Sequence, residues 1–388
     1  MDSALPYWRL SGFYFAYFAL LGATAPFLSL YFAHLGFSPA RIGELAAIPL
    51  LMRCLSPFVW GWLGDVTGRR LAIVRLGAVC TLLAFALILF DKSFMWLAMV
   101  MALHAFFWHA ILPQFEAITL AHLRERPTFY SRVRLWGSIG FIVAVVGLGW
   151  LFDWLSLNSF PAAMLVIMLA IVVTAWRVPD AAPSPSGDTT VHEGFWKLLL
   201  KPGVPAFFLC VVLMQASHGP YYTFLTIHLE NLGYPRGTIG LIWAMGVVAE
   251  IGVFMVMARI LDRFSLRRVL MFSMLLAALR WLLMGYLADE LFVLLFAQLL
   301  HAASFGCFHS AAVHFVQRAF GIRHLGRGQA SYATVSGMGG ALGALYAGYS
   351  WSALGAGPTF LIATAGATLA AFIIAKRLKD TPHSAPPV

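Results

Sequence analysis

The chain has 388 residues, of which 61% are hydrophobic and 11% are charged, and its mean hydropathy is +0.82. Soluble domains carry about 25% charged residues, so a soluble globular protein is excluded and the chain is predicted to be an integral membrane protein. The formal net charge of +10 is explained by arginines in the loops between membrane spans, and no nucleic-acid partner is expected.

Apolar runs of membrane-spanning length follow one another along the chain, since a helix needs about 20 apolar residues to cross the hydrocarbon core. The first six spans are predicted at about 9–33, 41–63, 71–90, 94–121, 131–153 and 160–177. The second six are predicted at about 203–229, 237–261, 269–287, 290–319, 328–350 and 356–376. No small-residue cleavage site follows the first run, which is therefore predicted to be a retained helix and not a signal peptide.

The longest link between predicted spans contains the stretch PDAAPSPSGDTTVHEG. Its content of Pro, Ser, Gly and Asp is typical of a mobile linker. We predict an N-terminal six-helix bundle over residues 1–177, a cytoplasmic linker over 178–202, and a C-terminal six-helix bundle with a short cytoplasmic tail over 203–388. The predicted fold class is an all-α membrane protein with twelve transmembrane helices.

The positive charges predict the orientation in the membrane. With the N-terminus inside, most of the 26 Lys and Arg residues fall in or beside predicted cytoplasmic segments, as the positive-inside rule requires. This places both termini in the cytoplasm of a multi-pass protein of the bacterial inner membrane. The four cysteines lie in apolar runs without metal-ligand spacing, so no metal and no cofactor are predicted.

The two halves of the chain resemble each other, which indicates an internal repeat. The segment LGFSPARIGELAAIPLLMR from Leu35 corresponds to LGYPRGTIGLIWAMGVVAE from Leu232. The same offset pairs Arg53 in the first half with Glu250 in the second. Two six-helix halves related by a repeat are the architecture of an alternating-access carrier, whose substrate site lies near the midplane of the membrane.

The loop GWLGDVTGRRL, from Gly61 to Leu71, follows the pattern G-x-L-x-D-x-x-G-R-[RK] that joins helices 2 and 3 in the major facilitator superfamily. Glycines let helices approach closely, and the charged groups can pair across helix ends in one conformational state only. The second copy, ARILDRFSLRR, keeps the aspartate and the arginines but loses the glycines. The predicted gating residues are Gly61, Asp65, Gly68, Arg69, Arg70 and Asp262. The alternative is a loop whose charges only set the topology.

Ionisable residues inside membrane spans are costly and usually face a partner or a water-filled cavity. Six such residues occur in the predicted spans: Arg53, Glu116, Arg134, Glu250, Arg280 and His301. A purely structural role in interhelical salt bridges is the alternative to function.

The chain resembles the phenylpropionate permease family, on the lactose permease branch of the major facilitator superfamily, over its full length. The resemblance is carried by stretches such as YSRVRLWGSIGF from Tyr130, LMQASHGPYYTF from Leu213 and QLLHAASFGCFH from Gln298. It implies two pseudosymmetric six-helix bundles, a substrate-gripping pair of Glu116 and Arg134, and a coupling set of Glu250, Arg280 and His301. Ser304 stands near the position of the proton-carrying glutamate of lactose permease, so proton coupling must use another group.

The charges of the site favour an anionic substrate. Three arginines face two carboxylates, and the fork of a guanidinium suits a carboxylate. Aromatic residues in the same segments suit a flat apolar substrate. The predicted substrate-binding residues are Arg53, Glu116, Arg134, Trp136, His218, Tyr222, Trp243 and Arg280. Glu250 is predicted to bind the coupling proton beside Arg280, and His301 to share it, because imidazole titrates near physiological pH.

The leading hypothesis is a monomeric secondary transporter, not an enzyme, that imports a small organic acid, such as an aromatic acid, with a proton. The alternatives within transport are import of a larger ligand (a siderophore or a peptidoglycan fragment), import of a sugar or nucleoside, and export of hydrophobic compounds by proton antiport. Helix 5 lacks the Gly-Pro pair of many antiporters, which argues against export. A membrane enzyme or a sensor is the alternative outside transport, but we find neither an HExxH motif nor a phosphate-binding glycine loop.

Overall fold

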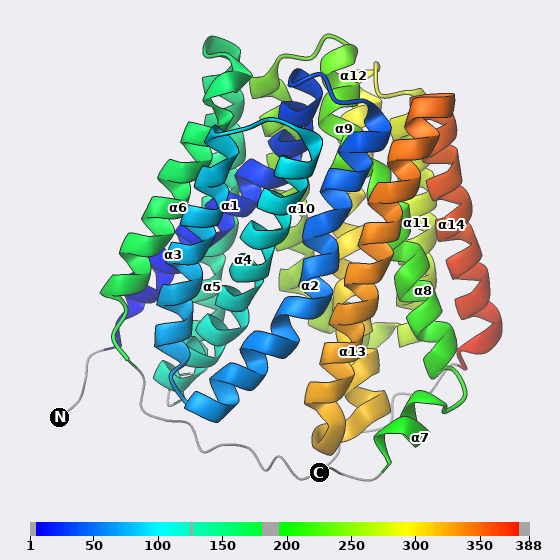
Figure 1. Cartoon of the computed structure of the whole chain (residues 1–388). Helices are drawn as coiled ribbons and strands as arrows, with labels where there is room; N and C mark the ends of the chain where they lie inside the picture. Colours follow the sequence, from blue (N-terminus) through cyan, green and yellow to red (C-terminus); the bar gives the residue numbers. More distant parts are fainter. Residues whose placement is uncertain (1–4, 125, 127, 181–193, 380–388) are drawn as a thin grey trace. The chain divides into compact units, whose positions relative to one another are not determined.

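The computed structural model describes residues 5–124, 126, 128–180 and 194–379, and within these ranges the chain is helical, without a strand (Figure 1). The first half contains α1 (Tyr7–His34), α2 (Pro39–Thr67), α3 (Arg70–Ala86), the 3₁₀ turn η1 (Leu87–Leu89), α4 (Phe94–His122), α5 (Phe129–Trp154), the 3₁₀ turn η2 (Leu157–Ser159) and α6 (Phe160–Arg177). The second half contains α7 (Phe195–Leu199), α8 (Val204–Ser217), α9 (Gly219–Asn231), α10 (Arg236–Arg263), α11 (Leu266–Tyr286), α12 (Leu291–Leu299), the π-helical segment η3 (Ala302–Cys307), α13 (Phe308–Leu354) and α14 (Ala356–Arg377). The predicted all-α fold is confirmed.

Ten helical segments of the described residues are long and apolar enough to cross a membrane. The two remaining predicted spans are also helical but less regular. The span predicted at 203–229 consists of α8 and α9, which meet at His218, because Pro220 in the first turn of α9 lacks the N–H that a continuous helix would need. The span predicted at 328–350 lies in α13 beyond Gly321, whose φ of 60° and ψ of 179° interrupt the helical backbone.

The chain divides into two compact units. The first comprises Met1–Thr189 with Tyr234–Leu241, and the second comprises Thr190–Gly233 with Ile242–Val388. The first residues of α10 therefore belong to the first unit, and the remainder of this helix belongs to the second. The predicted linker at 178–202 lies largely outside the described residues, and α7 is the helix in its described part.

The same pairs of helices pack together in each unit. In the first unit α1 packs against α5 and α6, and α3 packs against α6. In the second unit α8 packs against α13 and α14, and α11 packs against α14. These are equivalent pairs in the order of spans, so the packing inside each unit follows the internal repeat seen in the sequence.

Glycines bring the paired helices into backbone contact. A Cβ atom on Gly140 of α5 would lie 2.1 Å from the carbonyl oxygen of Phe15 on α1, and one on Gly22 of α1 would lie 2.5 Å from that of Phe141. In the second unit a Cβ on Gly219 of α9 would lie 2.2 Å from the carbonyl oxygen of Gly343 on α13. Small residues at these positions permit the close packing on which helix association in membranes depends.

The carboxylate of Asp153, at the end of α5, caps the start of α10 within the first unit. Its two oxygens accept hydrogen bonds from the backbone N–H groups of Arg236 and Gly237, each at 2.8 Å. In return, Nη1 of Arg236 donates to the carbonyl oxygen of Phe152 at 2.7 Å. A carboxylate satisfies the free N–H groups and complements the dipole at a helix N-terminus.

Replacing Asp153 with alanine should therefore destabilise the protein. The loss of an N-cap costs about 0.5–2 kcal/mol, so we expect a lower melting temperature of the detergent-solubilised protein, followed with a thiol-reactive dye that reports exposure of the four free cysteines. Asp262→Ala, at an exposed position near the other end of α10, is the matched control. Equal melting temperatures for the two variants would show that the cap adds nothing to stability.

Candidate functional site

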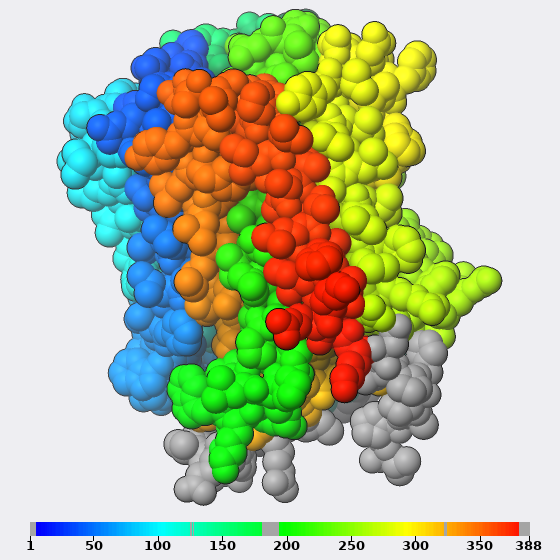
Figure 2. Space-filling model, turned by 90° about the vertical axis from the view of Figure 1, so that its right-hand side faces the viewer, coloured from blue at the N-terminus to red at the C-terminus, as the bar shows by residue number. Residues whose placement is uncertain are grey.

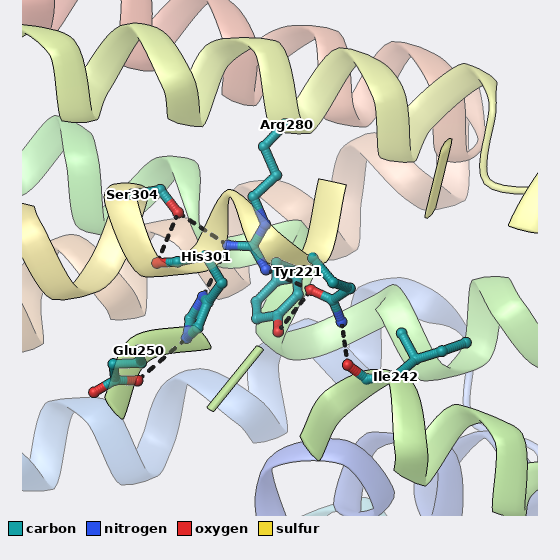
Figure 3. Close-up of polar contacts among 7 residues, drawn as sticks. Tyr221, Ile242, Glu250, Arg280, His301 and Ser304 are labelled. Carbon is teal, nitrogen blue, oxygen red and sulfur yellow. Dashed lines mark hydrogen bonds and ion pairs between the residues drawn. The ribbon is translucent and has the colours of Figure 1, made fainter. Parts of the chain in front are cut away.

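A fully buried guanidinium organises the polar cluster of the second unit (Figure 3). Arg280 on α11 has no exposed surface. Its Nη1 donates to Nδ1 of His301 at 3.0 Å and to Oγ of Ser304 at 3.2 Å. Its Nη2 donates to Oε1 of Gln298 at 2.8 Å. Burying a cation is costly unless it is paired or hydrogen-bonded, and these three acceptors offset part of that cost, although the buried Nε of Arg280 has no hydrogen-bond partner in the described part of the chain.

The imidazole of His301 lies between this cation and a carboxylate. Because an arginine can only donate, Nδ1 of His301 must accept, which assigns the ring proton to Nε2. Nε2 in turn lies 3.6 Å from a carboxylate oxygen of Glu250 on α10. The predicted coupling residues are thus brought together as a chain that runs from Arg280 through His301 to Glu250, in a region where both His301 and Arg280 are buried.

An irregular backbone carries this chain. His301 directly precedes the π-helical segment η3, and π-helical turns inside α-helices are frequent at functional sites. The ring of Phe305, within η3, stacks on that of His301 with centroids 5.3 Å apart and an interplanar angle of 11°. The wider turn therefore holds the imidazole against a flat apolar ring while its two nitrogens face polar partners.

Aromatic rings close the cluster on its other side. The guanidinium carbon of Arg280 lies 4.1 Å from the ring centre of Tyr221 and 4.8 Å from that of Trp281, which adds cation–π stabilisation to the hydrogen bonds. Tyr221 also donates to Oε1 of Gln298 at 3.4 Å, and Nε2 of Gln298 donates to the carbonyl oxygen of Ile242 at 3.2 Å. Tyr221, Gln298 and Ser304 were not among the predicted site residues.

Three other predicted residues of the second unit pack around Tyr221. The indole of Trp243 lies 4.7 Å from its ring and donates to Oγ1 of Thr226 at 3.1 Å. His218, at the junction of α8 and α9, donates from Nδ1 to the carbonyl oxygen of Met214 at 2.8 Å. The ring of Tyr222 stacks on His218, with centroids 5.9 Å apart, and is 38% exposed. The structure therefore places these side chains beside the Arg280 cluster.

A second polar cluster lies in the first unit, on α1, α2, α4 and α5. The hydroxyl of Tyr130 is hydrogen-bonded to Glu116 and to Arg134. The guanidinium carbon of Arg134 lies 3.9 Å from the ring centre of Phe18 on α1. A Cβ on Gly137 would lie 2.8 Å from Nη1 of Arg134, so this glycine makes room for the guanidinium. The predicted pair of Glu116 and Arg134 is therefore joined through Tyr130.

Tyr17 on α1 is the residue at which the charges of the first unit converge. Arg53, Glu116 and Arg134 all act electrostatically on its hydroxyl. Its ring lies 5.5 Å from that of Trp108 on α4. Tyr17 was not among the predicted site residues, because one tyrosine in an aromatic-rich helix is not distinctive. Its spacing of three residues from Tyr14 nevertheless places both rings on one helical face.

Arg53 differs from the other two intramembrane arginines. Arg134 is hydrogen-bonded and stacked, and Arg280 is fully buried and hydrogen-bonded, whereas Arg53 is exposed. Its guanidinium has no hydrogen bond and no ion pair within the described ranges. It lies close enough to Tyr17 and to His109 on α4 to act on both electrostatically.

Trp136, predicted to bind substrate, is not brought to this cluster. Its indole donates to the hydroxyl of Tyr7 at 3.1 Å, and its ring lies 5.6 Å from that of Trp8. Two residues of α-helix turn a side chain by about 200°, so Trp136 must leave the face on which Arg134 lies. It packs against the start of α1 instead.

The predicted gating loop forms a bonded network at the end of α2. Nη2 of Arg70 lies 2.7 Å from Oδ1 of Asp65, and its Nη1 donates to Oε1 of Gln114 on α4 at 2.9 Å. Gly68 ends α2 with a φ of 64°, a conformation that favours glycine. Close approach depends on Gly64, where a Cβ would lie 2.6 Å from Gln114, and not on the predicted Gly61, where a Cβ would meet no atom within 4 Å.

The second copy of the loop has a different network. Arg267, which the repeat pairs with Arg70, donates from Nη2 to the carbonyl oxygen of Ala375 on α14 at 2.6 Å. Asp262 is exposed. Arg69 of the first copy is exposed as well and lines a hollow with Arg75.

Comparison with known proteins gives matches over nearly the whole chain. The model of the MFS_1 like family matches residues 7–362. The probable 3-phenylpropionic acid transporter of Escherichia coli (strain K12) is 29% identical over 355 residues, which cover 90% of this chain and 92% of that protein. The maltose permease of Geobacillus stearothermophilus is 27% identical over 374 residues, which cover 94% and 93% of the two chains. Among solved structures, a mutant of the nucleoside transporter NupG aligns with a TM-score of 0.86 and 16% identity over 96% of this chain and 100% of that one, which shows a shared fold.

Gln298 offers a test of how much the Arg280 cluster depends on its acceptors. Gln298→Leu leaves a donor of the buried guanidinium without a partner, at a cost of about 1–3 kcal/mol, so we expect a marked fall in melting temperature. Gln298→Glu keeps the acceptor and adds a charge, and should melt above the leucine variant. Gln317→Leu, at an exposed position on α13, is the control. If Gln298→Leu and this control have the same melting temperature, the hydrogen bond between Gln298 and Arg280 does not stabilise the cluster.

Proposed function

We propose that the chain, which belongs to the MFS_1 like family of major facilitator transporters, imports a small organic acid together with a proton. As a member of this family it is a multi-pass secondary transporter that acts on small molecules, and its relatives are transporters and not enzymes. The proposal concerns the substrate, the coupling ion and the residues that handle them.

The exposed guanidinium of Arg53 is the observation that carries the substrate proposal. An exposed arginine without a partner in the described part of the chain is available to a substrate, whereas Arg134 and Arg280 already have theirs. A carboxylate matches its fork of N–H donors. The hydroxyl of Tyr17, near Arg53, would donate to the second side of the same carboxylate.

The surroundings of Arg53 suit an aromatic acid. Tyr17 stands beside Phe18, with ring centroids 5.4 Å apart, and beside Trp108. Flat rings offer stacking and edge contacts to a flat substrate. The similarity to a protein named as a probable 3-phenylpropionic acid transporter supports the same substrate class.

Glu250 is the proposed proton carrier. Its carboxylate faces the Nε2–H of His301, whose other nitrogen is held by Arg280. Protonating Glu250 removes the negative charge at the end of this chain of contacts, so the cluster has two electrostatic states. A transporter that exposes Glu250 alternately to the two sides of the membrane would load the proton on one side and release it on the other. We place the protein in the bacterial inner membrane as a monomer, with both termini in the cytoplasm.

Import of a sugar or nucleoside is the second candidate. It is favoured by the similarity to a maltose permease over 94% of this chain, and the Glu116–Tyr130–Arg134 cluster offers both donors and acceptors to hydroxyl groups. Under this alternative the neutral substrate would contact Glu116, and Arg53 would have no anion to bind. The two candidates therefore differ in which variant loses transport.

Transport in liposomes tests the proposal directly. With an inward proton gradient we expect purified protein to accumulate labelled 3-phenylpropionate and not maltose. Arg53→Gln should reduce uptake of the acid about ten- to hundredfold, because a charge-assisted hydrogen bond is worth about 1.5–3 kcal/mol. Arg41→Gln, which removes an exposed arginine paired with Glu44, should transport like the wild type.

The coupling step has its own variant. Glu250→Gln cannot change its charge, so we expect it to exchange external for internal acid while failing to concentrate the acid along a proton gradient. Accumulation by Glu250→Gln at the wild-type level would reject Glu250 as the proton carrier. Uptake of maltose or a nucleoside in place of the acid would reject the substrate and leave the family assignment intact.

A further inference from the structure

A hollow of about 590 Å³ opens at the surface of the first unit, where α3 begins and α6 ends. Its lining combines cations with apolar groups. The lining residues are Arg69, Leu71, Ala72, Arg75, Leu76, Val79, Trp176 and Asp180. None of these residues belongs to the substrate or coupling clusters, and Arg69 alone among them is a predicted gating residue.

Arg75, one of the lining residues, is held by hydrogen bonds. Its guanidinium donates to the carbonyl oxygens of Ala175, Trp176 and Val178, at 3.4, 3.5 and 3.2 Å. These carbonyls belong to the end of α6, where a helix has no N–H partners of its own. The arginine therefore lies at the level at which α6 ends, which is the level of the lipid headgroups for a membrane helix.

The wall beside Arg75 is apolar and exposed. Leu76 is 50% exposed and Trp176 is 51% exposed, and the guanidinium carbon of Arg75 lies 5.7 Å from the ring centre of Trp176. Tryptophan at a helix end is typical of the membrane–water interface. A ligand that fits this wall needs an apolar part next to an anionic part.

The second unit also has a basic hollow, at the end of its last helix. Arg267 on α11 donates to the carbonyl oxygen of Ala375, as Arg75 on α3 does to the carbonyls of α6. A hollow of about 500 Å³ there is lined by Leu369, Phe372, Ile373, Lys376 and Arg377. Figure 2 shows α14, in red, running along the surface of this unit. All five lining residues of this second hollow lie on α14, so the two hollows share a basic and apolar composition and not residues paired by the repeat.

We propose that each hollow binds the headgroup of an anionic phospholipid, with its acyl chain on the neighbouring apolar wall. Two arginines outweigh the single carboxylate of Asp180 in the first hollow, and Lys376 and Arg377 make the second positive. Basic pockets between membrane helices bind such headgroups. The topology predicted from the sequence places both helix ends in the cytoplasmic leaflet.

Lipid fits better than a free anion. Inorganic phosphate would contact the guanidinium groups but leave Leu76 and Trp176 bare. A phosphatidylglycerol molecule covers both surfaces at once, and it is already concentrated at this depth of the bilayer. The proposal does not depend on the transported substrate.

Native mass spectrometry of the delipidated full-length protein in detergent tests the proposal. We expect phosphatidylglycerol to bind in preference to phosphatidylcholine of the same acyl chains. Arg69→Gln in the first hollow and Lys376→Gln in the second should each weaken phosphatidylglycerol binding about fivefold, the effect of one charge near a membrane surface. Arg41→Gln, whose arginine is paired with Glu44, should bind the lipid like the wild type. Undiminished binding by both hollow variants would overturn the proposal.

Two further arms identify the ligand and its place. Inorganic phosphate added in excess should leave bound phosphatidylglycerol in place, and its displacement would point to a free-anion site instead. In nanodiscs, brominated phosphatidylglycerol should quench more tryptophan fluorescence in the wild type than in Trp176→Phe. Equal quenching in these two proteins would place the lipid elsewhere. A melting temperature matched to that of the wild type shows that each variant is folded.

Discussion

A guanidinium buried among membrane helices must find acceptors, and Arg280 is the group on which the second unit depends. It donates a hydrogen bond to Nδ1 of His301, so the ring proton lies on Nε2, which faces Glu250. It also donates to Gln298, which lies in α12, and to Ser304, which lies in η3. These three acceptors are spaced three residues apart, which keeps them near one face of the chain segment, and the π-helical segment η3 begins directly after His301. Removing any acceptor therefore affects both stability and the state of Glu250.

The three intramembrane arginines have different roles because their partners differ. The Nη1 and Nη2 groups of Arg280 donate to neutral acceptors, and the guanidinium places a positive charge beside His301. Arg134 contacts Tyr130 and the ring of Phe18, so it positions neighbouring side chains as well as supplying a positive charge. Arg53 alone among them is exposed and without a partner in the described part of the chain. The first two already have their partners, which is why the substrate proposal rests on Arg53.

Hydropathy predicted the helices because it needs only a run of apolar residues, and the cost of membrane charge singled out Arg280, His301 and Glu250 because it needs only a residue type and its depth. Tyr17, Tyr130 and Gln298 were missed, since a tyrosine or an amide in an apolar run becomes informative only when its neighbours are known. Trp136 was predicted to bind substrate, and its indole donates instead to the hydroxyl of Tyr7 at the start of α1. Gly61 was predicted to permit close approach, and Gly64 does so. The sequence predicts how deep a residue lies in the membrane, whereas the packing of the helices determines which neighbour its side chain meets.

The internal repeat gives the two halves the same scaffold and opposite charges at one position. Arg53 and Glu250 occupy corresponding places on α2 and α10, and each lies beside the polar cluster of its own unit. Arg53 ends a group that includes Tyr17 and His109, while Glu250 ends the chain from Arg280. A cation at one copy of the position suits the binding of an anion, and a carboxylate at the other suits the binding of a proton. Duplication followed by one reversal of charge is therefore sufficient, in physical terms, to give a carrier separate sites for its substrate and its coupling ion.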